Sequence, residues 1–221
     1  MPQSISFSHI ATEFLEEHLG LIEVSNSSLL ASFQDTQNKK VPELEKITLE
    51  QLANKGAILV ETWTEQELIT KHISPIINLV DYFGDGYNDF ADRTFGYNFG
   101  EYNFSGAMDL LIARGKREPK TPYFCLHEYK KERNGKGDPK GQLLAEMLVA
   151  QALNRDAKTG FETIYGCYIV GRNWFWVILK DKEYAVSRAY DSTRIGDLSE
   201  IYLILVKIKY IIEDHIAQSK K

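Results

Sequence analysis

The chain has 221 residues, of which 43% are hydrophobic and 26% are charged, a composition typical of globular domains. A chain of this length buries a sizeable core without disulfide bonds or metal sites, so collagen-like, disordered and disulfide-scaffold classes are excluded. The net charge of −5 argues against strong non-specific binding of nucleic acid by the chain as a whole.

Targeting signals are not expected in this sequence. Its longest apolar run, residues 201–212, is interrupted by Lys207 and Lys209 and is shorter than the ~20 residues that a membrane-spanning helix needs. The N-terminus has no basic segment followed by an apolar one, which argues against a secretory signal. Cys125 and Cys167 lie in separate apolar runs and are expected to be reduced core residues. We therefore predict a cytoplasmic protein without a membrane partner.

The first 60 residues are predicted to form a helical extension that packs on a main domain formed by residues 61–221. Apolar spacing predicts helices over residues 5–19 and 42–54. The polar segment between them, residues 26–38, is predicted to be a loop.

The main domain is predicted to begin with a long helix over residues 62–82. Thr64 and Glu67 have the spacing of a capping box at its start, and Pro75 predicts a kink or a break inside it. A turn rich in glycine is expected next, at residues 84–88.

The elements that follow predict an α/β domain with a mixed sheet. The polar segment 114–121 indicates that the strands on either side of it form an antiparallel hairpin. The C-terminal helix is apolar over more than one face, which predicts packing against the N-terminal segment or a second subunit. The predicted strands cover residues 95–104, 106–113, 122–131, 164–170, 174–179 and 184–187, and the predicted helices cover residues 142–154 and 198–218.

Two carboxylates and one lysine are predicted to converge on this hairpin. Glu128 and Lys130 are two residues apart on one strand, so their side chains share a face, and Asp109 lies on the neighbouring strand. Carboxylate oxygens are the ligands that Mg²⁺ prefers, and a bound metal activates water for phosphodiester hydrolysis. A lysine stabilises the charge that develops on the phosphate. The alternative is a partly buried Glu–Lys pair with an unrelated Asp, but buried ionisable groups are rare unless they are paired or functional.

Three nearby residues complete the candidate site or its surroundings. Gln142 begins the following helix and is predicted either to face the strand ends or to be an ordinary helix-start residue. Glu146, one turn further along, is predicted to be a surface residue. His127 points to the opposite strand face from Glu128 and is predicted to be a packed core residue rather than a base.

The segment from Arg114 to Lys140 carries nine basic and four acidic residues, a local charge of +5 on a chain with net charge −5. A basic segment of this kind is compatible with a phosphate-binding surface. The alternative is a solvated hairpin and loop.

These residues together resemble the PD-(D/E)xK nuclease superfamily. The matching residues are Asp109, Glu128 with Lys130, and Gln142 at the head of the next helix, while Met108 stands in place of the proline in the family name. The helix from residue 64 to 77 is similar to the opening helix of the nuclease domains of type I restriction enzyme R subunits. Glu65 matches the family glutamate there, and the alternatives are that Glu67 points inward or that both residues are caps.

The resemblance, which covers residues 62–179, implies a restriction-endonuclease-like core with the order α-β-β-β-α-β. It implies that Asp109 and Glu128 hold Mg²⁺ or Mn²⁺, that Lys130 is the catalytic lysine, and that Gln142 and Glu65 assist. The implied function is a metal-dependent DNA nuclease of restriction, defence or DNA processing, with a homodimer and a motor or specificity subunit as partners. The motif G-x-x-x-x-G-K-[ST] is missing from this sequence, so any motor would be a separate chain. A catalytically silent nucleic-acid-binding or assembly module is the alternative function, and RNA is the alternative substrate.

Overall fold

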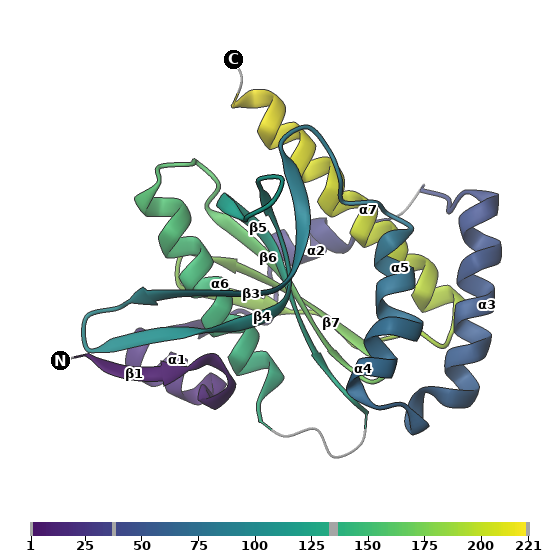
Figure 1. Cartoon of the computed structure of the whole chain (residues 1–221), viewed down its shortest axis with the longest axis horizontal. Helices are drawn as coiled ribbons and strands as arrows, with labels where there is room; N and C mark the ends of the chain where they lie inside the picture. The colour runs from purple at the N-terminus through teal and green to yellow at the C-terminus, as the bar shows by residue number, and fades with distance from the viewer. Residues whose placement is uncertain (1, 37–38, 133–136, 220–221) are drawn as a thin grey trace.

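The computed structural model describes residues 2–36, 39–132 and 137–219. Over these residues the chain folds into one mixed sheet with helices on both faces, which confirms the predicted α/β class (Figure 1). The strands are β1 (Gln3–Ser6), β2 (Ile22–Glu23), β3 (Tyr87–Asn98), β4 (Tyr102–Arg114), β5 (Lys120–Lys130), β6 (Thr163–Val170), β7 (Asn173–Lys180), β8 (Glu183–Val186) and β9 (Tyr190–Asp191). The α-helices are α1 (Thr12–Leu19), α2 (Ser28–Gln34), α3 (Glu43–Leu59), α4 (Glu65–Leu68), α5 (Ser74–Asn78), α6 (Pro139–Asp156) and α7 (Ile195–Gln218).

The strand order is β1-β4-β5-β6-β7-β8-β2, with β3 also paired to β4 and β9 to β7. The predicted hairpin is confirmed, because β4 and β5 are antiparallel with Leu110 opposite His127. On its other side β5 pairs in parallel with β6. Strand β5 is therefore an interior strand, with α6 on one face of the sheet and α7 on the other (Figure 1).

The single strand predicted over residues 95–104 is wrong, because the chain reverses direction inside it. Residues 99–101 form the turn between β3 and β4, where Gly100 has a φ of +83° and its N–H donates to Asn98 Oδ1 at 2.8 Å. Strand β3 begins at Tyr87, inside the segment predicted as a turn. The first half of β3 shows no regular apolar alternation, because Asp89, Asp92 and Arg93 fall among its apolar residues.

The N-terminal segment contributes strands as well as helices. Strand β1 pairs in parallel with β4, and the two-residue strand β2 pairs in parallel with β8. The loop predicted over residues 26–38 contains helix α2, whose N-terminal N–H of Leu30 donates to Ser27 Oγ at 3.2 Å. The helix predicted over residues 42–54 is confirmed and continues to Leu59. The strands escaped prediction because elements of two to four residues are too short to show a period.

The helix predicted over residues 62–82 is built from three consecutive pieces. The capping box of Thr64 and Glu67 is confirmed at the start of α4. A π-helical turn over Ile69–Ile73 separates α4 from α5, and Pro75 lies in the first turn of α5. Proline lacks an N–H donor and crowds the preceding turn, so this wider turn is the expected kink.

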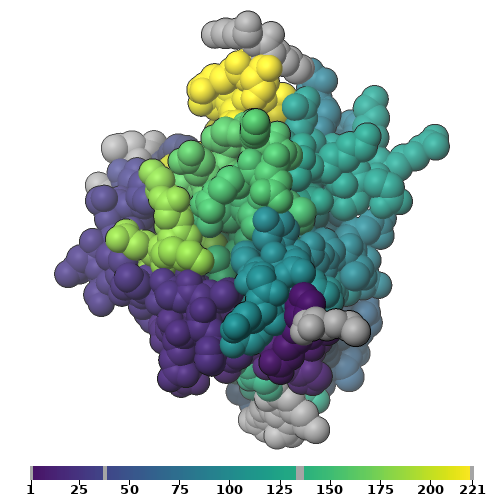
Figure 2. Space-filling view, turned by 90° about the vertical axis from the view of Figure 1, so that its left-hand side faces the viewer, coloured from purple at the N-terminus to yellow at the C-terminus, as the bar shows by residue number. Residues whose placement is uncertain are grey.

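The N-terminal segment covers the first half of α6. Figure 2 shows the N-terminal residues in purple over the lower part of this face, with the end of α6 in green above them. The side chain of Asp138 accepts hydrogen bonds from the N–H and Oγ1 of Thr12, at 2.8 and 2.7 Å. On the other face, α7 packs against α2, α3 and α5, so its wide apolar surface contacts the N-terminal segment, one of the two alternatives predicted. Among the described helices, none has the length and apolar character that crossing a membrane requires.

Candidate functional site

Asp109, Glu128 and Lys130 come together where β4 and β5 lie side by side. Continuing the β4–β5 register by one residue sets Asp109 opposite Glu128. The Oδ2 atom of Asp109 accepts the backbone N–H of Tyr129 at 2.7 Å, which holds this carboxylate against β5. The convergence expected from the spacing of these residues is therefore present in the fold.

Glu128 is the centre of the cluster. Its side chain is 1% exposed, and each of its carboxylate oxygens has a different donor. Lys130 Nζ donates to Oε1, and Gln142 Nε2 donates to Oε2 at 2.7 Å. Gln142 thus faces the strand, as one of the two alternatives predicted, and the first turns of α6 are tied to β5.

The electrostatics of the cluster disfavour negative charge. Burial and the nearby Asp109 carboxylate together raise the pKa of Glu128 to about 8, against the opposing effect of Lys130. Burial also raises the pKa of Asp109, although the N–H of Tyr129 and the charge of Lys130 act in the other direction. Two buried carboxyl groups whose pKa values are both raised form a site where a cation is favoured.

Lys130 is cationic at this site. Burial by itself would lower the pKa of its ammonium, but the hydrogen bond and the charge of Glu128 outweigh burial and raise this pKa above its usual value. The charges of Glu65 and Asp109 act in the same direction. The Lys130 side chain is 20% exposed, so its ammonium is both held by the cluster and open to solvent.

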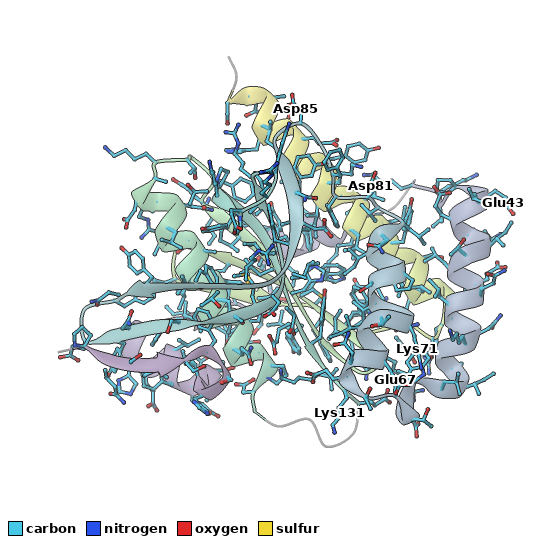
Figure 3. The ribbon with its side chains drawn as sticks, viewed as in Figure 1. Glu43, Glu67, Lys71, Asp81, Asp85 and Lys131 are labelled. Atoms are coloured by element: carbon cyan, nitrogen blue, oxygen red, sulfur yellow. The ribbon has the colours of Figure 1, made fainter. Side chains whose placement is uncertain are left out.

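Glu65, an exposed residue of α4, acts on the cluster through its charge. Its negative charge raises the pKa values of Asp109, Glu128 and Lys130, so it lies within electrostatic reach of all three. Glu67 is occupied elsewhere, because it bonds to Thr64 in the capping box and pairs with Lys71. That pairing lowers the pKa of Glu67 to about 2. Figure 3 shows Glu67 of α4 beside Lys71 of the π-helical turn that follows, and the alternative that Glu67 points into the site is therefore wrong.

Glu146 was predicted to lie on the surface, and this is wrong. Its side chain is completely buried, and its Oε1 accepts a hydrogen bond from Gln142 Nε2 at 3.3 Å. Its Oε2 has no partner among the described residues. Burial, together with the charge of Glu128, raises the pKa of Glu146 well above its usual range. The amide of Gln142 therefore bridges two buried carboxyl groups.

The misplacement of Glu146 has a physical cause. Glu146 lies one turn after Gln142 on the same face of α6, and this face packs against β5, so the carboxyl of Glu146 is buried beside Glu128. A signal was nevertheless present, since Glu146 is the only charged residue from Gly141 to Asn154. A lone charge in an apolar helix is a candidate functional residue.

His127 lies in the core on the opposite face, as predicted. Its ring is fully buried and packs near the rings of Tyr129, Trp174 and Trp176. Burial lowers the pKa of this imidazole to about 3, so it is neutral at physiological pH. Its face of β5 is opposite that of Glu128, which excludes it from the cluster.

The basic segment is divided by the fold, so its described basic residues do not form one phosphate-binding surface, the first of the two alternatives considered. Arg114 and Lys120 flank the turn of the β4–β5 hairpin, whereas Lys130 lies at the other end of β5. At roughly 3.3 Å per residue, the ten steps along the strand from Lys120 to Lys130 span about 33 Å. Residues 133–136 lie outside the described residues. Of the others, Lys140 pairs with Glu23 at 3.3 Å.

Comparison with protein-family models and with curated proteins finds no match to this chain. Its function therefore has to be inferred from the arrangement of its own residues.

Proposed function

We propose that the chain is a Mg²⁺- or Mn²⁺-dependent nuclease of the PD-(D/E)xK type that hydrolyses phosphodiester bonds of DNA. The observation that carries this proposal is the cluster of Asp109, Glu128 and Lys130, with Gln142 bonded to Glu128. The order α4/α5, β3, β4, β5, α6, β6 supports it, because it follows the α-β-β-β-α-β order of the restriction-endonuclease-like core.

The donor atoms of the cluster suit a hard divalent cation. Asp109 and Glu128 would hold the metal, and a cation would offset the burial of both carboxylates and the repulsion that Asp109 exerts on Glu128. Among the described residues, no group of three or more His, Cys, Asp or Glu side chains is arranged around a common metal position. Two carboxylates are enough for Mg²⁺, which keeps several of its waters in proteins. When bound, the metal would polarise a phosphoryl oxygen and acidify a coordinated water.

The other residues act by their charge and their hydrogen bonds. Lys130 presents a partly exposed ammonium next to Glu128, where it would stabilise the charge developing on a phosphate. Gln142 fixes the orientation of Glu128 through Oε2 and keeps Glu146 within the same hydrogen-bonded group. Burial raises the pKa of Glu146 and so favours its neutral form, which would reduce its repulsion of an incoming phosphate.

A catalytically silent binding or assembly module of the same fold is the second candidate. The observation that favours it is the division of the basic segment, which leaves few described cations near the cluster of an acidic chain. A nuclease that acts alone needs positive charge along its DNA path.

Cleavage of supercoiled plasmid and of single-stranded DNA in Mg²⁺ or Mn²⁺ tests the two candidates. We expect the wild type and Lys131→Ala to cleave DNA. We expect Lys130→Ala to cleave at least 100-fold more slowly, a loss on the order of that seen when one charge-stabilising group is removed from an active site. Full activity of Lys130→Ala would refute the proposed mechanism. If the wild type does not cleave DNA and its melting temperature is unchanged by Mg²⁺ or Mn²⁺, the catalytically silent module is favoured.

A further inference from the structure

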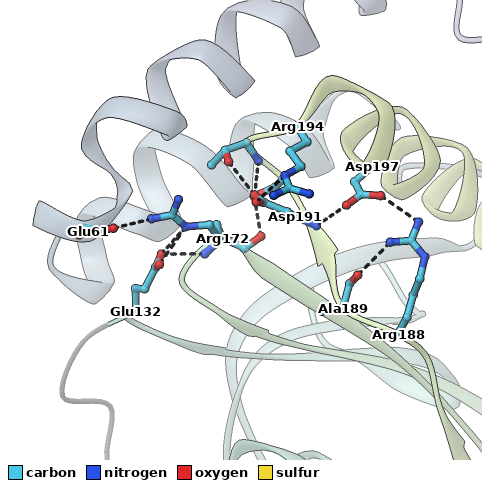
Figure 4. A network of polar contacts seen from close by, with 10 residues as sticks. Glu61, Glu132, Arg172, Arg188, Ala189, Asp191, Arg194 and Asp197 are labelled. Atoms are coloured by element: carbon cyan, nitrogen blue, oxygen red, sulfur yellow. Dashed lines mark hydrogen bonds and ion pairs between the residues drawn. The ribbon is translucent and has the colours of Figure 1, made fainter.

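Arg172 joins two segments that flank the candidate site. It lies in the turn between β6 and β7, where its Nε donates to Glu132 Oε1 at 2.8 Å and its Nη2 donates to Glu61 Oε1 at 2.9 Å. Its backbone N–H also donates to Glu132 Oε2, at 3.2 Å. Figure 4 shows the guanidinium of Arg172 between the two glutamates.

Each of the two glutamates is close in the sequence to a residue of the candidate site. Glu132 follows Lys130 by two residues, at the end of β5, and Glu61 precedes Glu65 by four residues, just before α4. One guanidinium therefore links the strand that carries Glu128 and Lys130 to the helix that carries Glu65. The guanidinium forms a planar fork with several donors, so it can hold two carboxylates at once, which a lysine ammonium does less well.

Backbone hydrogen bonds also attach the turn between β6 and β7 to its surroundings. The N–H of Gly171 donates to the carbonyl of Lys130 at 2.9 Å, which attaches the turn to the end of β5. The carbonyl of Arg172 accepts from the N–H and the Oγ of Ser192, both at 2.9 Å. The hydroxyl of Ser192 is also 2.9 Å from Nε2 of His72, in the π-helical turn that follows α4. The helix carrying Glu65 is thus held to this turn on both sides of Glu65.

The Arg172 pairs are partly shielded from solvent. The side chains of Arg172 and Glu132 are 22% and 20% exposed, and that of Glu61 is 47% exposed. Partly shielded, hydrogen-bonded ion pairs hold geometry better than fully exposed pairs, which contribute little.

We propose that Arg172 is a positioning residue that keeps Glu65 facing the cluster of Asp109, Glu128 and Lys130. The catalytic part of this inference rests on the proposed nuclease function, whereas the structural part does not. Loss of the link would let the segment before α4 move away from β5. Misplacement by about 1 Å costs an active site on the order of 100-fold in rate.

The test compares two arginines of the network drawn in Figure 4. Arg188 pairs with Asp197 at 2.8 Å and Glu200 at 3.1 Å, away from the cluster, so Arg188→Met is the matched control for Arg172→Met. Hydrogen exchange of residues 61–73 is followed by mass spectrometry, well below the melting temperature. We expect faster exchange in Arg172→Met, with Arg188→Met matching the wild type. We expect Arg172→Lys to be defective too, because an ammonium cannot replace the fork.

Cleavage kinetics then connect the link to Glu65. We expect Arg172→Met and Glu65→Gln each to lower kcat by 10-fold or more with little change in KM. The double variant should be no slower than the slower of the two single variants, because both substitutions disrupt the same interaction. Unchanged exchange of residues 61–73 in Arg172→Met, or multiplied losses in the double variant, would overturn the proposal. If the wild type does not cleave DNA, the nuclease proposal fails, and the exchange measurement alone decides whether Arg172 holds the helix.

Discussion

Replacing Glu146 by glutamine is expected to change how the stability of the protein depends on pH. The folded chain keeps a proton on this fully buried carboxyl to a higher pH than the unfolded chain does, because burial and Glu128 raise its pKa. The amide in Glu146→Gln has nearly the same shape and does not titrate. The variant therefore isolates the effect of this proton on folding.

The sign of the effect follows from where the proton is bound. Below the pKa of the unfolded chain, about 4.5, both states hold the proton and there is no difference between them. Above that pH the unfolded chain releases the proton and the folded chain does not, so the free energy of unfolding falls as pH rises. The fall is about 1.4 kcal/mol per pH unit for each proton retained by the folded chain. For a chain of this size, that corresponds to roughly 3–6 °C in melting temperature per pH unit.

The assay is urea or thermal unfolding at pH 5, 6, 7 and 8 with a chelator present, so that no metal contributes. We expect the stability of the wild type to fall more steeply from pH 5 upward than that of Glu146→Gln, and the variant to be the more stable protein at pH 7. Glu50→Gln, on an exposed position of α3, is the matched control and should follow the wild type. Equal slopes for wild type and Glu146→Gln would refute the assignment of a retained proton to Glu146.

Two further outcomes are expected from the geometry. Millimolar Mn²⁺ should raise the melting temperature of the wild type by several degrees, because a ligand that binds only the folded chain stabilises it. The melting temperature of Asp109→Asn should not change, and an equal rise in both proteins would exclude Asp109 as a ligand. In urea unfolding, Gly141→Ala should lose about 1–3 kcal/mol, because its new Cβ would lie 2.5 Å from the backbone N of Thr12. Gly196→Ala, in the first turn of α7 with no atom within 4 Å of its Cβ, should be stabilised by roughly 0.5–1 kcal/mol; a loss at Gly196 as large as that at Gly141 would contradict the packing explanation.

Local patterns were enough to predict the α/β class and the centre of the candidate site. The two-residue spacing of Glu128 and Lys130 sets them on one strand face, and the polar segment between β4 and β5 indicates the hairpin that brings in Asp109. Thr64 and Glu67 predict the start of α4, because a capping box involves only residues that are close in the sequence. These features depend on the backbone within one or two elements, and the chain carries that information locally.

The tertiary structure decided the features that depend on distant segments. Strands β1 and β2 exist because β4 and β8 offer them pairing partners far along the chain. Glu146 is buried because the face of α6 that it shares with Gln142 packs against β5, where Glu128 lies. The basic segment is split because β5 runs straight through the sheet and carries Lys120 and Lys130 to opposite ends. Burial and proximity of this kind are properties of the packed chain, so periodicity within one segment does not contain them.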